Sequence, residues 1–161
     1  MSNFNDYLAI RETKEQLTEH FSYWEMIRSG TALSYKIPNI PNDAEKQNLI
    51  KLCQHLEQIR AYLKIPLIVN VGFRSVEINK LIGGSATSSH IYGCAVDIKL
   101  AASMYKDILI GTKEGKIDPL DQIIIYQKQR FIHIGIVNPK HKYPRREVLD
   151  GERQYKLITK F

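Results

Sequence analysis

One long helical pattern limits what this chain can become. Between residues 43 and 63, apolar side chains recur every three or four positions with lysine and glutamate between them, as expected of an amphipathic helix. The apolar positions are Leu49, Leu52, Leu56, Ile59 and Leu63. Asn42 stands at the N-cap position, and Glu45 follows three residues later, as in a capping box. We therefore predict a helix over residues 43–63 that buries one face.

Short segments rich in β-branched residues follow this helix. The segments "PLIVNVGF", "CAVDIKL", "DQIIIY" and "RFIHIGIV" predict strands, the last two joined by "QKQ" as a hairpin. Shorter helical patterns lie between them, in "RSVEINKLIGG" and "ASMYKDILIG". Because helices come first and strands dominate later, we predict an α+β fold with a mainly antiparallel sheet and helices packed on it.

The length and the charge of the chain limit its domain organisation and its class of partner. The 161 residues, 43% of them hydrophobic, suit a single domain over residues 1–161, with a core at about 21–137 and a basic C-terminal tail at about 138–161. The formal net charge is +6, and a basic surface attracts any polyanion, whether nucleic acid, membrane surface or anionic cell wall. No zinc-finger, helix-turn-helix or ribonucleoprotein motif accompanies the tail, so a nucleic-acid partner is the least favoured of these.

The N-terminus and the hydropathy pattern bear on location. No apolar run approaches the ~20 residues that span a bilayer. The start "MSNFNDYLAIRETKEQ" lacks the basic and apolar regions of a secretory signal. We expect a protein made in the cytoplasm without a membrane span. A phage lysin, a virion component and a bacterial cytoplasmic domain all fit this expectation, and the oligomeric state stays open.

Three residues form a candidate metal site. In "SSHIYGCAVDIK", His90 and Asp97 are separated by six residues, and Gly93 permits a tight bend between them. His133 stands between two isoleucines on a later predicted strand, so its side chain points to the face opposite theirs. If the two strands adjoin, the three side chains converge, and two histidines with one carboxylate leave a fourth zinc position for water, as in catalytic sites. On spacing alone, such a His–Asp pair is more often a surface pair or involves a core histidine.

The surrounding residues resemble a known family. "SSHIYGCAVD" matches the pattern Ser-x-His-x-x-Gly-x-Ala-x-Asp at all five fixed positions. This resembles the signature of the zinc D-Ala-D-Ala carboxypeptidase and L-alanyl-D-glutamate peptidase family, which has the hedgehog/DD-peptidase fold. "FSYWEMIRSGTALSYKIPNIP", "VNVGFRS", "INKLIGGSATSSH" and "DQIII" are similar to segments of its phage and bacterial members. The resemblance runs from about residue 21 to residue 136.

The resemblance implies roles for individual residues. It implies that His90, Asp97 and His133 bind Zn²⁺, and that the substrate is a peptidoglycan stem peptide. It also implies that Arg74 binds a substrate carboxylate or the scissile carbonyl oxygen, which a planar guanidinium does well; a surface salt bridge is the alternative. Ser88 is expected to hydrogen-bond substrate or to orient its loop.

The chain departs from the family at the catalytic base. Active members carry a glutamate on the strand before the third zinc ligand, and alignment puts Tyr126 in its place, with Gln127 beside it. A tyrosine hydroxyl, with an ordinary pKa near ~10, is a poor base near neutral pH.

Three interpretations of this departure remain. In the first, another carboxylate serves as base, with Glu114, Asp118 and Asp121 as candidates. In the second, zinc activates the water without a general base, and the reaction is slower. In the third, the domain binds peptidoglycan without cutting it. The predicted function is a zinc-dependent carboxypeptidase or endopeptidase of stem peptides, weakened by Tyr126. The alternative is a catalytically inactive module that retains zinc and serves in cell-wall binding or in the phage virion.

Overall fold

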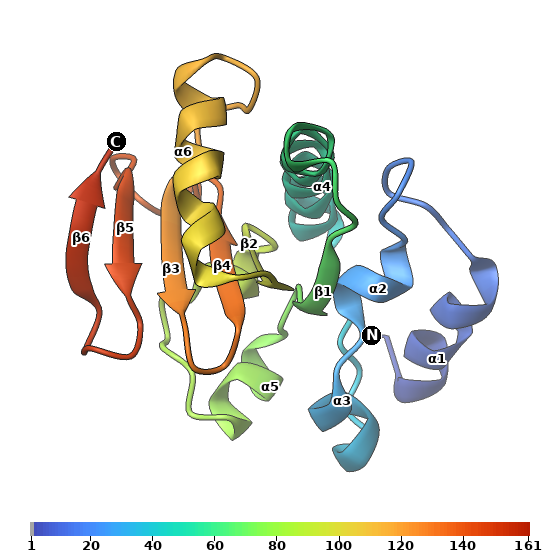
Figure 1. Cartoon of the computed structure of the whole chain (residues 1–161). Helices are drawn as coiled ribbons and strands as arrows, with labels where there is room; N and C mark the ends of the chain where they lie inside the picture. Colours follow the sequence, from blue (N-terminus) through green and yellow to red (C-terminus); the bar gives the residue numbers. More distant parts are fainter. Residues whose placement is uncertain (1) are drawn as a thin grey trace.

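The computed structural model describes residues 2–161, which form six α-helices and one six-stranded sheet (Figure 1). The helices are α1 (Phe4–Thr13), α2 (Tyr23–Ile27), α3 (Gly30–Tyr35), α4 (Asp43–Leu63), α5 (Val76–Leu81) and α6 (Tyr105–Lys113). The 3₁₀ turns are η1 (Ser89–Tyr92) and η2 (Ala102–Met104). The strands are β1 (Ile68–Val71), β2 (Ala95–Lys99), β3 (Gln122–Tyr126), β4 (Phe131–Gly135), β5 (Glu147–Asp150) and β6 (Lys156–Lys160).

Helix α4 begins and ends where the sequence pattern predicts. The Asn42 side chain accepts a hydrogen bond from the backbone N–H of Glu45 at 2.9 Å, and the Glu45 carboxylate accepts one from the N–H of Asn42 at 2.8 Å. This capping box satisfies backbone donors that a helix start leaves free. The buried side chains are Leu49, Leu52, Cys53, Leu56 and Ile59. They join one hydrophobic core with residues of α6 and the sheet.

The sheet has the order β1-β2-β4-β3-β5-β6. All neighbouring strands are antiparallel except β3 and β5, which are parallel. The predicted α+β class with a mainly antiparallel sheet is therefore confirmed. The predicted hairpin is also present, because β3 and β4 pair from Gln122 opposite Gly135 to Tyr126 opposite Phe131.

The two faces of the sheet differ in chemistry, because successive side chains of a strand point to opposite faces. One face belongs to the hydrophobic core and carries Val96, Ile98, Ile123, Ile132, Ile134 and Val148. The alternate positions bear polar groups, among them Asp97 on β2 and His133 on β4, which lie directly opposite each other. The core thus supports a polar face on which a site can form.

The last 24 residues, for which the charge pattern predicts a basic tail, contain two strands. β5 pairs with β3, and β6 pairs with β5 at the edge of the sheet (Figure 1). The segments "EVLD" and "KLITK" are short and rich in charge, so their sequence does not predict a strand. The division into a core and a tail within a single domain stays a prediction.

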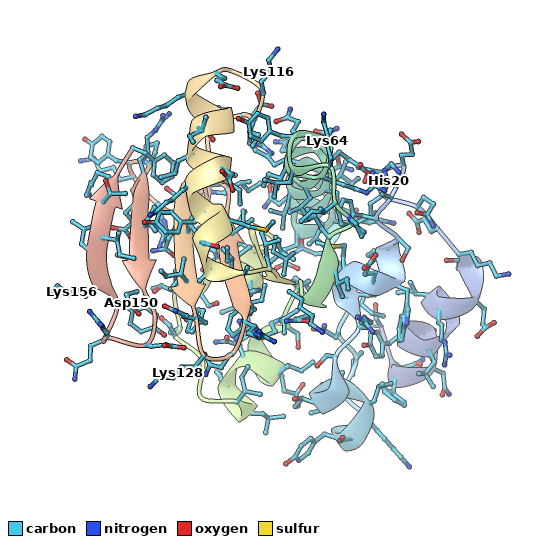
Figure 2. All side chains as sticks on the ribbon, in the orientation of Figure 1. His20, Lys64, Lys116, Lys128, Asp150 and Lys156 are labelled. Carbon is cyan, nitrogen blue, oxygen red and sulfur yellow. The ribbon has the colours of Figure 1, made fainter. Side chains whose placement is uncertain are left out.

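Several lysine side chains project from the surface of the molecule. Lys116, Lys128 and Lys156 extend away from the ribbon (Figure 2). Within residues 2–161, no helix combines the length and apolar character needed to cross a membrane.

Candidate metal centre

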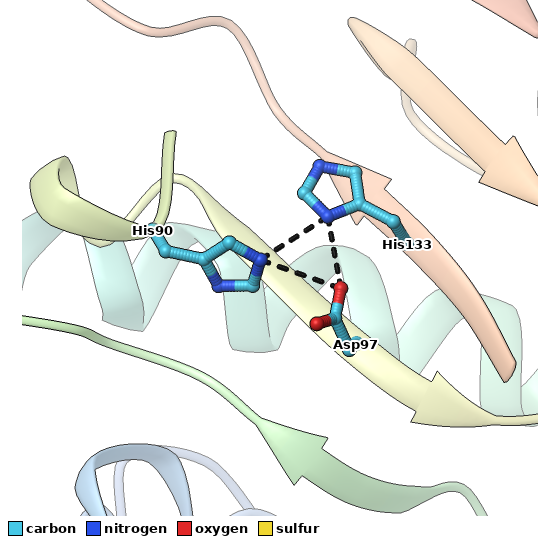
Figure 3. A group of neighbouring side chains, drawn as sticks. All are labelled: His90, Asp97 and His133. Atoms are coloured by element: carbon cyan, nitrogen blue, oxygen red, sulfur yellow. Dashed lines mark hydrogen bonds and ion pairs between the residues drawn. The ribbon is translucent and has the colours of Figure 1, made fainter. Parts of the chain in front are cut away.

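Three side chains that are far apart in the sequence meet on the polar face of the sheet (Figure 3). His90 comes from η1, Asp97 from β2 and His133 from β4. One potential ligand atom of each lies within 4.8 Å of the others. The Asp97 Oδ1 atom is 2.9 Å from His133 Nδ1 and 3.3 Å from His90 Nε2, and the two ring nitrogens are 3.2 Å apart.

Local backbone geometry brings His90 to the two strands. Gly93 ends η1 with a φ of 68°, a left-handed conformation that glycine adopts without a steric penalty. Two residues later β2 begins, so the bend aims His90 back over the strand that carries Asp97. The side chain of Asn48 on α4 donates a hydrogen bond to the Tyr92 carbonyl at 2.9 Å, which holds η1 against the long helix.

The hydrogen bonds of His90 define its tautomer. Its Nδ1–H donates to the backbone carbonyl of Gly72 at 2.7 Å, since a carbonyl only accepts. In the neutral ring the lone pair is therefore on Nε2, the atom that faces Asp97 and His133. Such a backbone partner on the far nitrogen is the usual support of a metal-binding histidine.

Burial and mutual contact favour a neutral His90 and an ionised Asp97. Burial lowers the pKa of His90 below its ordinary value, and this outweighs the opposing effect of the Asp97 carboxylate. Burial works against ionisation of Asp97, but the neighbouring imidazoles of His90 and His133 hold the pKa of that carboxyl well below its usual range. A neutral imidazole and a carboxylate are the forms that bind a divalent cation.

The donor set fits zinc. Two imidazole nitrogens and one carboxylate oxygen converge, His90 is 2% and His133 8% exposed, and the cluster opens on one side into a cavity. Three protein ligands with access for a fourth are typical of catalytic rather than structural zinc sites. The structure thus brings together the three residues that the sequence analysis singled out as metal ligands.

The cavity has a volume of about 450 Å³, and Arg74 and Ser88 both line it. The buried side chain of Asn39 donates to the Phe73 carbonyl at 3.0 Å and accepts from the Ser75 N–H at 2.7 Å. These bonds fix the backbone on both sides of Arg74. The Arg74 Nη1 atom donates to Asn79 at 3.2 Å, while its buried Nε finds no partner within residues 2–161. Among the described residues the Nη2 atom has no hydrogen-bond partner, so this end of the guanidinium is the one left to bind a ligand.

Tyr126 also lines the cavity, but it is not free to act as a base. Its ring stacks on Phe131 with 4.2 Å between ring centroids, and its hydroxyl donates to Tyr155 at 3.5 Å. Burial and the contact with Tyr155 raise the pKa of the Tyr126 phenol above its ordinary value. Gln127 lines a different cavity with Ala101 and Arg130.

None of the three alternative carboxylates lines the cavity. The Glu114 carboxylate accepts from the Tyr62 hydroxyl, and that of Asp118 accepts from Gln58. Asp121 is fully buried and paired with Arg145. Among residues 2–161, Asp97 is the only carboxylate on the cavity wall.

The cavity is also lined by residues that the sequence did not predict as site residues. They are Gln122, Ile124, Arg145, Leu149 and Tyr155. Strand alternation signals the first two, which share a face of β3 with Tyr126. No local pattern marks Arg145, Leu149 or Tyr155, because they reach the cavity only through the pairing of β5 with β3.

Comparison with known proteins agrees with this geometry. The sequence model of a family described as Peptidase M15 matches residues 19–135, more than half of the chain. A search among curated proteins found no match.

Proposed function

Because the chain belongs to the Peptidase M15 family, we propose that it is a zinc-dependent peptidase that acts on peptidoglycan stem peptides. The observation that carries the proposal is the convergence of His90, Asp97 and His133 at the base of an open cavity. The family and the cluster together fit a zinc peptidase. The substrate is inferred from the resemblance to stem-peptide peptidases.

In this proposal, His90 Nε2, Asp97 Oδ1 and His133 Nδ1 hold the zinc ion. When bound, zinc would polarise the scissile carbonyl and lower the pKa of a water toward ~7. The Gly72 carbonyl keeps the His90 ring in the required tautomer through a 2.7 Å hydrogen bond. Nδ1 of His133 would bind zinc only in the neutral tautomer that carries the ring proton on Nε2, so its hydrogen bond to Asp97 would be replaced on metal binding.

Arg74 is proposed to bind the charged end of the peptide or the oxygen that develops negative charge. Its side chain lines the cavity, and Asn79 engages only the Nη1 atom of the guanidinium, which supports this role because the other terminal nitrogen can donate to a carboxylate or an oxyanion. Ser88 lines the same cavity, and its side chain makes no capping hydrogen bond to η1. It is therefore available to hydrogen-bond the substrate.

We expect slow turnover. Loss of a general base typically costs ~10²–10⁴-fold in rate, and Tyr126 holds a phenol of raised pKa where the family has a glutamate. The same observation favours a second candidate function, a module that retains zinc and binds cell-wall peptides without cutting them, in a phage virion or at the cell wall.

Mass spectrometry of stem peptides incubated with the zinc-loaded protein tests the proposal. Slow cleavage that His133→Ala abolishes supports a peptidase. Peptide binding in calorimetry without cleavage supports the second candidate. If the protein neither binds nor cleaves D-Ala-terminated or alanyl-γ-glutamyl peptides, both candidate functions are ruled out.

A further inference from the structure

The cavity contains a second guanidinium group, on the opposite side from Arg74. Arg74 follows β1, whereas Arg145 precedes β5. In the sheet order, β1 lies on one side of the β2–β4 pair that carries Asp97 and His133, and β3 and β5 lie on the other. Both arginines line the same cavity. They therefore approach the metal cluster from two sides.

A buried carboxylate holds Arg145 in place. Asp121 is fully buried, and its Oδ2 accepts from Arg145 Nε at 2.7 Å and pairs with Nη2 at 2.6 Å. Its Oδ1 also accepts from the Arg145 backbone N–H at 2.6 Å. The Nη2 atom further donates to the Ser89 hydroxyl at 3.5 Å, next to His90. One edge of the guanidinium is thereby fixed.

The other edge of Arg145 remains available. Its Nη1 donates to no residue of the described chain, and 29% of the side chain is exposed. A guanidinium that is oriented by one carboxylate and presents its remaining donors to a cavity loses little entropy when a second carboxylate binds.

The charge of the cavity wall favours anions. Arg74, Arg145 and Asp97 are its only charged groups among the described residues, apart from the two histidines. The Asp97 carboxylate is engaged by His90 and His133. The nearest acid on β5, Glu147, accepts a hydrogen bond from Gln122 at 2.7 Å and does not line the cavity.

We propose that Arg145 is a second anion-binding residue of this site, so that the preferred substrate is a peptide with two free carboxylates, one for each arginine. A γ-linked glutamate residue supplies such a group, because its α-carboxylate stays free within the chain. This inference rests on the proposed function and deepens it: the preferred stem peptides carry a free glutamate α-carboxylate rather than its amide. Arg145 lies beyond residues 19–135, so this preference comes from a part of the chain that the family match does not cover.

The test compares two stem peptides that differ only in this group, a γ-linked D-glutamate with a free α-carboxylate and the same residue as its α-amide. Dissociation constants are measured with the zinc-loaded full chain by fluorescence polarisation. If cleavage is observed, the ratio of kcat/KM values replaces the ratio of dissociation constants. The wild type should prefer the free acid by about 10- to 100-fold, the range of a charge-assisted hydrogen bond.

Variants assign the preference to Arg145. Arg145→Lys keeps a positive charge beside Asp121 but loses the second donor edge. The double variant Asp121→Asn with Arg145→Gln removes the guanidinium without leaving a buried charge unpaired. In both variants, the ratio of the dissociation constants for the amide and the free acid should be close to one. Arg153→Lys is the matched control, since Arg153 pairs with Asp150 in the same C-terminal segment but lies outside the cavity.

Two outcomes would overturn the inference and leave the proposed function standing. One is equal binding of acid and amide by the wild type. The other is a preference that survives in both Arg145 variants. If the wild type binds neither peptide, the proposed function fails and the inference fails with it.

Discussion

At the scale of single residues, Gly93 combines two requirements for glycine next to the site, a left-handed backbone conformation and a close approach to α4. Its φ is 68°, and a Cβ atom there would overlap the backbone carbonyl oxygen of Glu45 on α4. Any other residue would combine backbone strain with a collision between η1 and the long helix. Because Gly93 turns the chain between His90 and β2, the same change would displace a metal ligand.

We predict that Gly93→Ala lowers the free energy of unfolding by about 2 kcal/mol or more and weakens zinc binding. Urea denaturation and zinc titration measure the two effects. Gly30→Ala is the control, because a Cβ at Gly30 meets nothing within 4 Å. That change should be neutral or stabilising by about 0.4–1 kcal/mol. Equal stability of the two variants would contradict the strain argument.

In our proposal, the side chain at position 126 limits the rate of peptide cleavage. Tyr126→Glu would place a carboxylate on the cavity face of β3, two residue pairs along the β3–β4 ladder from His133. We expect peptidase activity on stem peptides to rise by ~10²-fold or more, measured as the initial rate of product release. Gln127→Glu should leave the rate unchanged, because Gln127 lines a different cavity.

The opposite result would be equally informative. If the wild type cleaves stem peptides rapidly and Tyr126→Glu slows it, another group serves as base. If neither variant cleaves while zinc stays bound, the non-catalytic module becomes the better description.

At the scale of elements, α4 supports the site from behind. Its stripe of leucines packs in the core, and Asn48 and the Glu45 carbonyl lie against the turn that carries His90. The helix start is fixed by the capping box of Asn42 and Glu45. The stability of this one element therefore bears on the position of a metal ligand.

We predict that Asn42→Ala costs about 1 kcal/mol of unfolding free energy, the usual value for a lost N-cap. Gln47→Ala, at an exposed position of the same helix, should change stability by less than about 0.5 kcal/mol. Thermal or urea unfolding distinguishes the two. A similar loss in both variants would mean that the cap contributes nothing specific.

At the scale of the whole molecule, zinc should couple to global stability, because the three proposed ligands come from η1, β2 and β4. An ion that binds only the folded chain stabilises it by about 2.7 kcal/mol at a free concentration of 100 times Kd. For a chain of 161 residues this corresponds to a rise in Tm of roughly 5–10 °C.

Scanning calorimetry with and without zinc measures this shift. His133→Ala should abolish it, while His55→Ala should retain it, because the His55 ring bonds the Lys51 carbonyl on α4, away from the cluster. A wild-type Tm that zinc does not change would argue against a site with ligands from three elements.

The sequence by itself determined what depends on near neighbours. The cap and apolar spacing of α4, the His90–Gly93–Asp97 bend and the side of the strand on which His133 stands all follow from residues a few positions apart. The helices α1, α2 and α3 went unpredicted, since two of them have only five or six residues and α1 buries only Tyr7. Segments with so few residues or so few buried side chains show little helical periodicity in their apolar positions.

Only the tertiary structure decided the pairing of distant segments. The register that sets Asp97 opposite His133, the parallel placement of β5 beside β3, and the arrival of Arg145 and Tyr155 at the cavity all join residues that are widely separated in the chain. The same holds at position 126: the resemblance puts Tyr126 in the place of the family's base, but its contact with Tyr155 requires β5 to pair beside β3 and β6 beside β5. Such contacts are selected by the packing of the whole core, which no local spacing encodes.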